Sequence, residues 1–263
     1  MNGAPAILSG SPSRLSDEGR GRLLSRRGEP LFVAGWERAL FIHFEVDAAA
    51  LQHDVPFSLD LRDGKAFVSL VAFTMRDMRF RRGGSALSLL LRPLATHQFL
   101  NVRTYVRPGG ERGIYFITEW LSNWLSVQLG PLLYGLPYHH AKINYHHAHE
   151  ENFLAGKVEA KKRGGNFNYE AQLSSDKNFA PCPADSLDEF LLERYTAYTA
   201  RGFTRRFFRI WHPPWPQTPV EVSIKADSLL WKTWTWFGDA RLIGANYSPG
   251  FAEVWMGRAH RVR

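Results

Sequence analysis

Apolar and polar residues alternate along much of this chain, and a period of two residues is typical of β-strands with one buried face. In residues 36–47, for example, Leu40 and Ile42 fall on one face, whereas His43 and Glu45 fall on the other. The same alternation, or a short apolar run between turn residues, predicts further strands at residues 66–73, 99–106, 113–118, 137–149, 151–160, 166–173, 204–211, 218–226 and 249–258.

Two stretches change to the period of a helix. Between residues 119 and 134, side chains recur every three or four positions and predict a helix that packs one face inward: Trp120, Leu121, Trp124, Leu125, Gln128 and Leu132. Ser186 and Glu189 have the spacing of a capping box, and Gly202 is placed to end the helix that follows. Because strands outnumber helices, the predicted fold class is mostly β (α+β).

The sequence predicts one folded domain. Residues 1–29 are rich in Ser, Gly and Arg and poor in aromatic residues, so we expect a flexible N-terminal extension. No repeat or linker divides residues 30–263, and 263 residues are within the range of one all-β domain. No apolar run approaches 18 residues, so no membrane span is expected. The lack of a signal-peptide pattern and the single Cys182 favour a cytoplasmic protein without an internal disulfide.

The net charge is +8, which permits attraction to acidic partners. The basic residues stand in short scattered groups rather than in one stripe, so the pattern does not favour nucleic-acid binding. A solvated basic surface is the simpler interpretation. No P-loop, GxGxxG or GxSxG motif is present, and no cofactor is predicted.

Polar side chains concentrate between residues 137 and 150, which hold five of the ten histidines. On a strand, His147 and His149 share a face and could bind a metal through their imidazoles. No standard metal-ligand spacing such as HExxH is present, and a polar strand face explains the pair as well. Lys142 lies between Ala141 and Ile143; an apolar setting could lower its pKa for Schiff-base chemistry, or its head could reach solvent.

A second candidate site lies on the strand at residues 99–106, where Asn101 and Arg103 leave the same face. An arginine beside an amide can hold a carboxylate through charge-assisted hydrogen bonds. A structural ion pair, with Glu119 for example, explains Arg103 equally well.

Several motifs occur in an order that resembles the YqjF-like family, whose function is unknown. The match spans about residues 31–258 and rests on Asn101-Val102-Arg103-Thr104-Tyr105-Val106, Gly113-Ile114-Tyr115-Phe116-Ile117, Leu133-Tyr134-Gly135-Leu136-Pro137-Tyr138-His139-His140, Phe190-Leu191-Leu192-Glu193-Arg194-Tyr195, His212-Pro213-Pro214-Trp215-Pro216 and Tyr247-Ser248-Pro249-Gly250. This family is similar to acetoacetate decarboxylase. The resemblance implies a closed, cone-like antiparallel β-barrel with a few helices and an interior cavity.

One segment of this chain departs from the pattern of acetoacetate decarboxylases. Acetoacetate decarboxylases carry a Tyr-Pro-Lys-Lys segment with the Schiff-base lysine just after a helix, and Pro137-Tyr138-His139-His140 stands there in this chain. Histidines in place of the lysine pair predict that Schiff-base decarboxylation is absent. Lys142, on the same strand face as His140, remains the alternative nucleophile.

These observations predict an internal pocket lined by Asn101, Arg103, His139, His140 and Lys142. The expected ligand is a small molecule with a carbonyl or carboxylate group, either neutral or anionic. The first alternative is an enzyme acting on such a compound through Lys142 or the His139 and His140 region. The second is an interaction module that uses the basic surface. The sequence is compatible with an oligomer.

Overall fold

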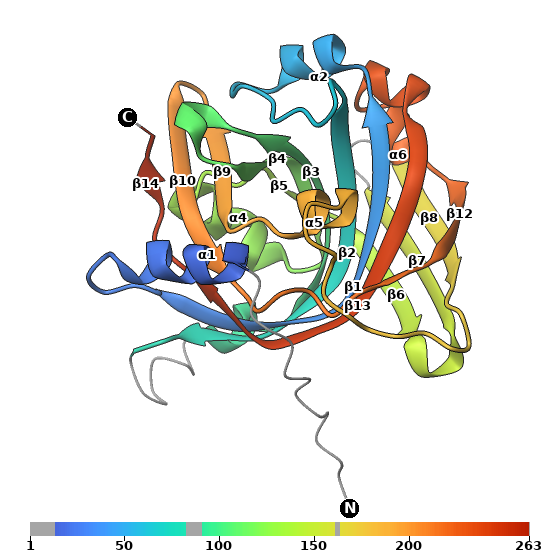
Figure 1. The fold of residues 1–263 in the computed structure, drawn as a ribbon, viewed down its shortest axis with the longest axis horizontal. Coiled ribbons are helices and arrows are strands. Elements are labelled where there is room, and N and C mark those ends of the chain that lie inside the picture. Colours follow the sequence, from blue (N-terminus) through green and yellow to red (C-terminus); the bar gives the residue numbers. More distant parts are fainter. Residues whose placement is uncertain (1–13, 83–90, 161–163, 263) are drawn as a thin grey trace, which may run out of the picture.

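Two β-sheets make up most of the computed structural model, which describes residues 14–82, 91–160 and 164–262. Figure 1 shows the long strands of the main sheet curving around one side of the molecule. In spatial order, the main sheet contains β11 (Thr218–Pro219), β13 (Arg241–Met256), β1 (Phe32–Val46), β2 (Ala66–Phe80), β3 (His97–Val106), β4 (Gly113–Leu121), β9 (Thr196–Arg201), β10 (Thr204–Trp211) and β14 (His260–Arg261), with β5 (Tyr138–His140) beside β4. The smaller sheet has the order β12 (Glu221–Ala226), β8 (Gly165–Gln172), β7 (Phe153–Ala160) and β6 (Lys142–Ala148).

Among the residues that the structure describes, helices are few and short, which confirms the predicted mostly β class. They are α1 (Arg14–Leu24), α2 (Ala48–Asp54), α4 (Trp124–Leu133), α5 (Leu187–Leu192) and α6 (Ser228–Trp231), with the 3₁₀ turns η1 (Arg92–Leu94), η2 (Pro108–Gly110), η3 (His149–Glu151) and η4 (Thr235–Asp239). Within the described residues, no helix is both long and apolar enough to span a bilayer.

The strand pairs are antiparallel except where β4 meets β5 and β9, which run parallel to it. The predicted hairpin across Pro108–Gly110 is confirmed as β3 and β4. At the far end of the sheet, β10 also pairs with β13, through Ile210 with Met256 and Trp211 with Trp255. The paired strands therefore run in order from β13 through β1 to β10, and β10 pairs with β13 again.

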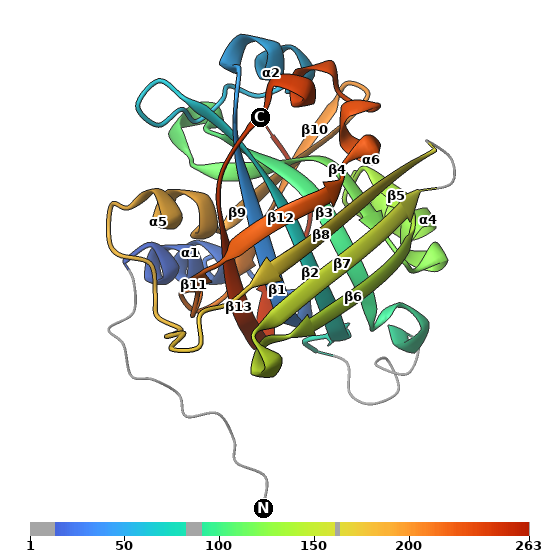
Figure 2. The same ribbon diagram turned by 90° about the vertical axis from the view of Figure 1, so that its right-hand side faces the viewer.

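The two faces of the main sheet have different surroundings. The smaller sheet packs across one face, as Figure 2 shows, and Leu100 and Val102 of β3 lie in the apolar core between the sheets. Phe99 and Tyr105 belong to a second apolar cluster on the opposite face. Because side chains alternate along a strand, β3 contributes to both cores.

The chain before β1 contains a helix where a flexible extension was expected. Helix α1 packs on β10: Leu23 is buried, and the Ser16 hydroxyl donates to the carbonyl of His212 at 2.9 Å. Residues 1–13 lie outside the described part of the chain. The helical pattern of residues 14–24 is weak because the buried side of α1 includes Ser16 and Gly19 rather than a row of large apolar residues.

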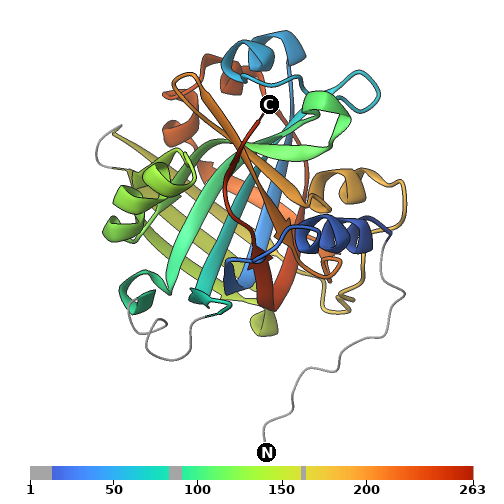
Figure 3. The ribbon, with the colours of Figure 1, turned by 90° about the vertical axis from the view of Figure 1, so that its left-hand side faces the viewer.

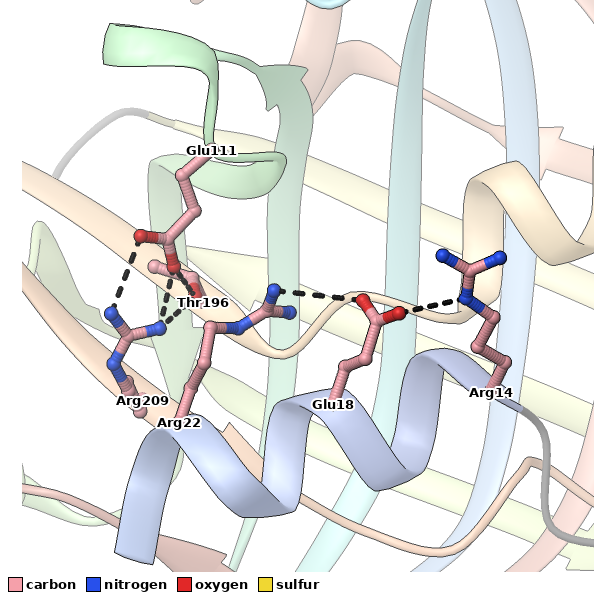
Figure 4. Close-up of polar contacts among 6 residues, drawn as sticks. All are labelled: Arg14, Glu18, Arg22, Glu111, Thr196 and Arg209. Carbon is pink, nitrogen blue, oxygen red and sulfur yellow. Dashed lines mark hydrogen bonds and ion pairs between the residues drawn. The ribbon is translucent and has the colours of Figure 1, made fainter. Parts of the chain in front are cut away.

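Charged side chains lie on the side of α1 that faces away from its buried residues. Figure 4 shows Glu18 between Arg14 and Arg22 on this helix, with Nε–Oε1 and Nη1–Oε2 distances of 2.8 and 3.9 Å. Beside them, Arg209 of β10 binds Glu111, which also accepts a hydrogen bond from Thr196. Although burial opposes ionisation, Thr196, Arg209 and Arg22 hold the pKa of Glu111 below its usual value. Glu111 therefore stays ionised and links the β3–β4 turn to β10.

Two predicted helices differ from those found. The stretch 119–134 is divided, because its first residues complete β4 and α4 begins only at Trp124, after the N-cap Asn123. The inward face predicted for this helix was wrong, since Trp124, Leu125, Gln128 and Leu132 are exposed. The capping box at Ser186 is confirmed, but α5 ends at Leu192 and Gly202 lies in the turn between β9 and β10.

Candidate functional site

A mainly apolar cavity of about 230 Å³ lies on the face of the main sheet opposite the smaller sheet. Strands β1 to β4, β10 and β13 supply its walls, and α4 and η1 lie at its edge. Its aromatic lining comes from Phe32, Trp36, Phe73, Phe80, Phe99, Phe116, Tyr134, Tyr138 and Phe208. Figure 3 views the molecule from the side on which α4 and the main sheet are visible together. The size and lining suit a small, mostly apolar molecule.

A narrow inner space of about 20 Å³ adjoins this cavity. Both spaces are lined by Trp36, Phe73, Asn101, Phe116 and Ile210, so the inner one extends the outer one towards the middle of the sheet. Its further lining includes Arg103, His212 and Trp215. The inner space is large enough for one or two atoms of a polar group.

Polar residues reach these spaces from one face of β3. His97 and Asn101 line the outer cavity, and Asn101 and Arg103 line the inner space. Glu119 joins them because β3 and β4 pair Asn101 directly with Glu119. All four side chains are buried, with at most 6% of their surface exposed.

Several atoms of this group have no hydrogen-bond partner within the described residues. They are Asn101 Oδ1, Glu119 Oε2 and Arg103 Nε. A buried polar atom without a partner costs about 1–3 kcal/mol. Such atoms beside an empty space point to a molecule that completes their hydrogen bonds.

The surroundings of Glu119 favour its neutral, protonated form. Burial raises its pKa well above the usual range, and the hydrogen bond from Asn101 only partly offsets that effect. A protonated carboxyl group can both donate and accept a hydrogen bond. Glu119 can therefore donate to a ligand oxygen, which an ionised carboxylate could not do.

His97 is also neutral. Burial lowers its pKa to about 4, although the nearby carbonyl of Leu94 favours the protonated ring. A neutral imidazole presents one donor and one acceptor. The outer cavity is thus lined by uncharged polar groups.

Arg103 supplies the only positive charge among these four residues. Its Nη2 donates to the carbonyl of Leu191 at 3.0 Å, and its guanidinium carbon lies 5.4 Å from the centre of the Phe41 ring. No carboxylate forms an ion pair with Arg103 within the described residues, so the pair with Glu119 that the sequence allowed is not formed. Burial lowers the pKa of His43 to about 3, with the charge of Arg103 as a second cause.

The structure separates the five predicted pocket residues. Asn101 and Arg103 line the two spaces, whereas His139, His140 and Lys142 line neither. On β5, Tyr138 faces the cavity and the His139 ring lies 6.5 Å from Trp120, which belongs to the core between the sheets. His140 and Lys142 are exposed. Ala141 separates β5 of the main sheet from β6 of the smaller sheet, so the single strand predicted for residues 137–149 is interrupted.

The rings of His147 and His149 make contacts with other residues of the protein. The ring nitrogens of His147 lie 2.6 Å from the Arg38 carbonyl and 2.7 Å from the Tyr169 hydroxyl. Nδ1 of His149 lies 2.9 Å from the Tyr247 hydroxyl. Across the ranges that the structure describes, no three potential ligands gather as a metal site would require.

Glu119, His97 and Tyr138 were missed as lining residues by the sequence analysis. The available signal was a lone carboxylate within the apolar run Ile114–Leu121, which becomes informative once that run is assigned to a strand. We had assigned Glu119 to the start of a helix, where an acidic residue is ordinary.

Comparisons with known proteins agree with this architecture. The chain is 29% identical over 208 residues to the uncharacterized protein YqjF of Bacillus subtilis, covering 74% of this chain and 78% of YqjF. Acetoacetate decarboxylase from Legionella pneumophila has the same fold, with a TM-score of 0.62, 13% identity and coverage of 88% and 87% of the two chains.

A second similar structure is the enduracididine biosynthesis enzyme MppR, complexed with the condensation product of pyruvate and imidazole 4-carboxaldehyde. Its TM-score is 0.59, with 11% identity and coverage of 88% of this chain and 89% of MppR. At these identities the structural likeness defines the fold and not the activity. Residues 33–239 match the DUF2071 family, described as "Uncharacterized conserved protein (COG2071)". The chain therefore belongs to the DUF2071 family and has the acetoacetate decarboxylase-like fold.

Proposed function

We propose that the protein binds a small carbonyl or carboxylate compound in the cavity. The observation that carries the proposal is the group of unpartnered atoms on Asn101, Arg103 and Glu119 beside a space that is otherwise apolar. The ligand's apolar part would lie among the aromatic side chains of the outer cavity. Its oxygen atoms would accept from Arg103 Nε and from protonated Glu119. The fold of MppR, which has been seen with a pyruvate-derived product, supports this class of ligand.

The proposal includes the closed barrel implied by the sequence resemblance. The pairing of β10 with β13 supports closure, since it joins strands at the two sides of the cavity. Closure would hold Asn101 of β3 and Ile210 of β10 at fixed positions around the ligand.

Replacing Arg103 with methionine tests the binding site. A methionine keeps most of the apolar volume but cannot donate to an oxyanion. We expect the affinity for short 2-oxo acids and fatty acids, measured by isothermal titration calorimetry, to fall about 100-fold, as loss of a charged hydrogen bond predicts. The melting temperature should stay nearly constant, because replacing a buried charge by an apolar side chain is often neutral.

The exposed Arg205 provides the control, since Arg205→Met removes the same charge away from the cavity. If Arg103→Met instead lowers stability by about 3–5 kcal/mol and leaves affinity unchanged, Arg103 is structural. Wild-type protein that binds none of these acids would refute the proposed function.

The proposal also excludes Schiff-base decarboxylation. Lys142 is exposed on β6 and does not line the cavity, which supports this exclusion. We expect borohydride treatment in the presence of acetoacetate to leave the intact mass unchanged, because no lysine of the described residues lines the cavity where a bound ketone would react. A covalent adduct that peptide mapping places on Lys142 would restore the enzyme alternative.

A further inference from the structure

Helix α4 has its smallest residues inside and its largest apolar residues outside. Ser126 is buried, and Gly130 lies so close to the Tyr138 ring that an added Cβ would come within 2.2 Å of it. Five large apolar side chains face outward: Trp124 at 61% exposure, Leu125 at 40%, Leu129 at 41%, Leu132 at 63% and Leu133 at 59%. This order is the reverse of a helix that stabilises a core through its apolar face.

The turn between β9 and β10 is tied to the end of α4 by two arginines. Phe203 at its tip is fully exposed. Arg201 and Arg206, on either side of the turn, donate to the carbonyls of Pro131 and Leu132 at 3.2 and 3.3 Å. We call the five outward α4 residues and Phe203 the α4 patch. Figures 2 and 3 show α4 at the outer edge of the molecule.

Positive charges flank the α4 patch at both ends. The exposed Arg92 belongs to η1, which is fixed to the start of α4 by a hydrogen bond from Asn123 to the carbonyl of Pro93. Arg201 and Arg206 lie at the other end. The segments 91–94, 123–134 and 201–206 contain no Asp or Glu. The patch thus combines exposed leucines and aromatic residues with arginines that have no acidic residue in the same segments.

We propose that the α4 patch docks on an anionic lipid surface. Exposed Trp, Leu and Phe side chains enter the boundary between headgroups and acyl chains, while arginines bind lipid phosphates. A second copy of this chain fits less well, because a symmetric contact through the patch would bring arginines together without carboxylates to pair with them. Leu129 and Leu133 also line the cavity, so the docked side is the side on which the cavity reaches α4.

Co-sedimentation with vesicles tests this proposal without reference to the cavity ligand. We expect wild-type protein to bind vesicles of equal phosphatidylcholine and phosphatidylglycerol, and to bind pure phosphatidylcholine vesicles much more weakly. Arg92→Gln and Arg201→Gln should each weaken binding to the anionic vesicles about five-fold, and raised salt should weaken it further.

The double variant Trp124→Ser, Leu132→Ser should weaken vesicle binding about ten-fold or more, because both side chains are exposed and would lose their apolar contact with lipid. Neither residue lines the cavity, so binding of small acids should be unchanged. Trp231→Ser is the matched control, since Trp231 is 49% exposed on α6, outside the α4 patch.

Three outcomes would overturn the proposal. The first is wild-type protein that ignores anionic vesicles, and the second is equal binding by the wild type and the double variant. The third is a homodimer in sedimentation velocity that Trp124→Ser, Leu132→Ser converts to monomer, which would assign the patch to a second copy.

Discussion

Replacing Asp60 with alanine should lower the free energy of unfolding by about 3–5 kcal/mol. Asp60 is buried and binds Arg194 at 2.7 Å, and Arg107 and Arg112 approach it at 3.1 and 3.3 Å. The Arg194 side chain is only 2% exposed, and burial lowers its pKa to about 10 even with Asp60 present. Removing the carboxylate would leave this guanidinium buried without its counter-charge.

Urea unfolding followed by tryptophan fluorescence measures this loss. Glu253→Ala serves as the control, because Glu253 binds Arg79 at 2.9 Å on the exposed surface, where an ion pair contributes at most about 1 kcal/mol. A similar, small effect of both substitutions would contradict the role assigned to Asp60.

Stability should also fall by about 3 kcal/mol in total as the pH is lowered from 6.5 to 5. Four histidines are buried as neutral rings: burial lowers the pKa of His97, His147 and His212 to about 4 and that of His43 to about 3. Each ring takes up a proton when the chain unfolds below its ordinary pKa of about 6.5. Acid therefore favours the unfolded state in this window.

Two buried carboxyl groups have the opposite effect on the pH dependence of stability. Burial raises the pKa of Glu119 well above its usual value and that of Glu193 to about 7, so each releases a proton on unfolding at pH 5–6.5. On balance, unfolding takes up almost no protons at pH 6.5, where only half of the unfolded imidazoles are protonated, and about two protons at pH 5. Each proton taken up corresponds to about 1.4 kcal/mol per pH unit.

Urea unfolding at pH 6.5, 6 and 5 measures this slope. Glu119→Gln is an informative variant to compare with the wild type, because it removes one proton that unfolding releases. The loss of stability on acidification should become steeper by about 1.4 kcal/mol per pH unit. Stability that is constant across this range would contradict the neutral state assigned to the four buried histidines.

Local patterns predicted the strands well because alternation survives wherever a strand has one buried face. Asn101 and Arg103 were expected on one face of one strand, and they line the connected spaces. The sequence analysis also placed His139 beside them, but His139 lines neither space. Which face of β5 meets the cavity depends on its parallel pairing with β4, a contact between segments separated by the whole of α4.

Helix α4 shows a second limit of sequence patterns. Its apolar residues have helical spacing, and spacing alone cannot tell whether a row of leucines faces a core or the outside. The deciding contact is that of Gly130 with Tyr138, where only a residue without a side chain permits the close approach. That contact turns the small residues inward and leaves the leucines exposed.

The division of β3 between two cores has a consequence for how the family can diversify. Leu100 and Val102 support the packing of the two sheets, whereas His97, Asn101 and Arg103 face the cavity on the opposite side of the same strand. A mutation at one of the cavity positions leaves the intersheet packing untouched. Selection can therefore alter what the cavity accepts at little risk to folding, and relatives with one architecture can evolve towards different small molecules.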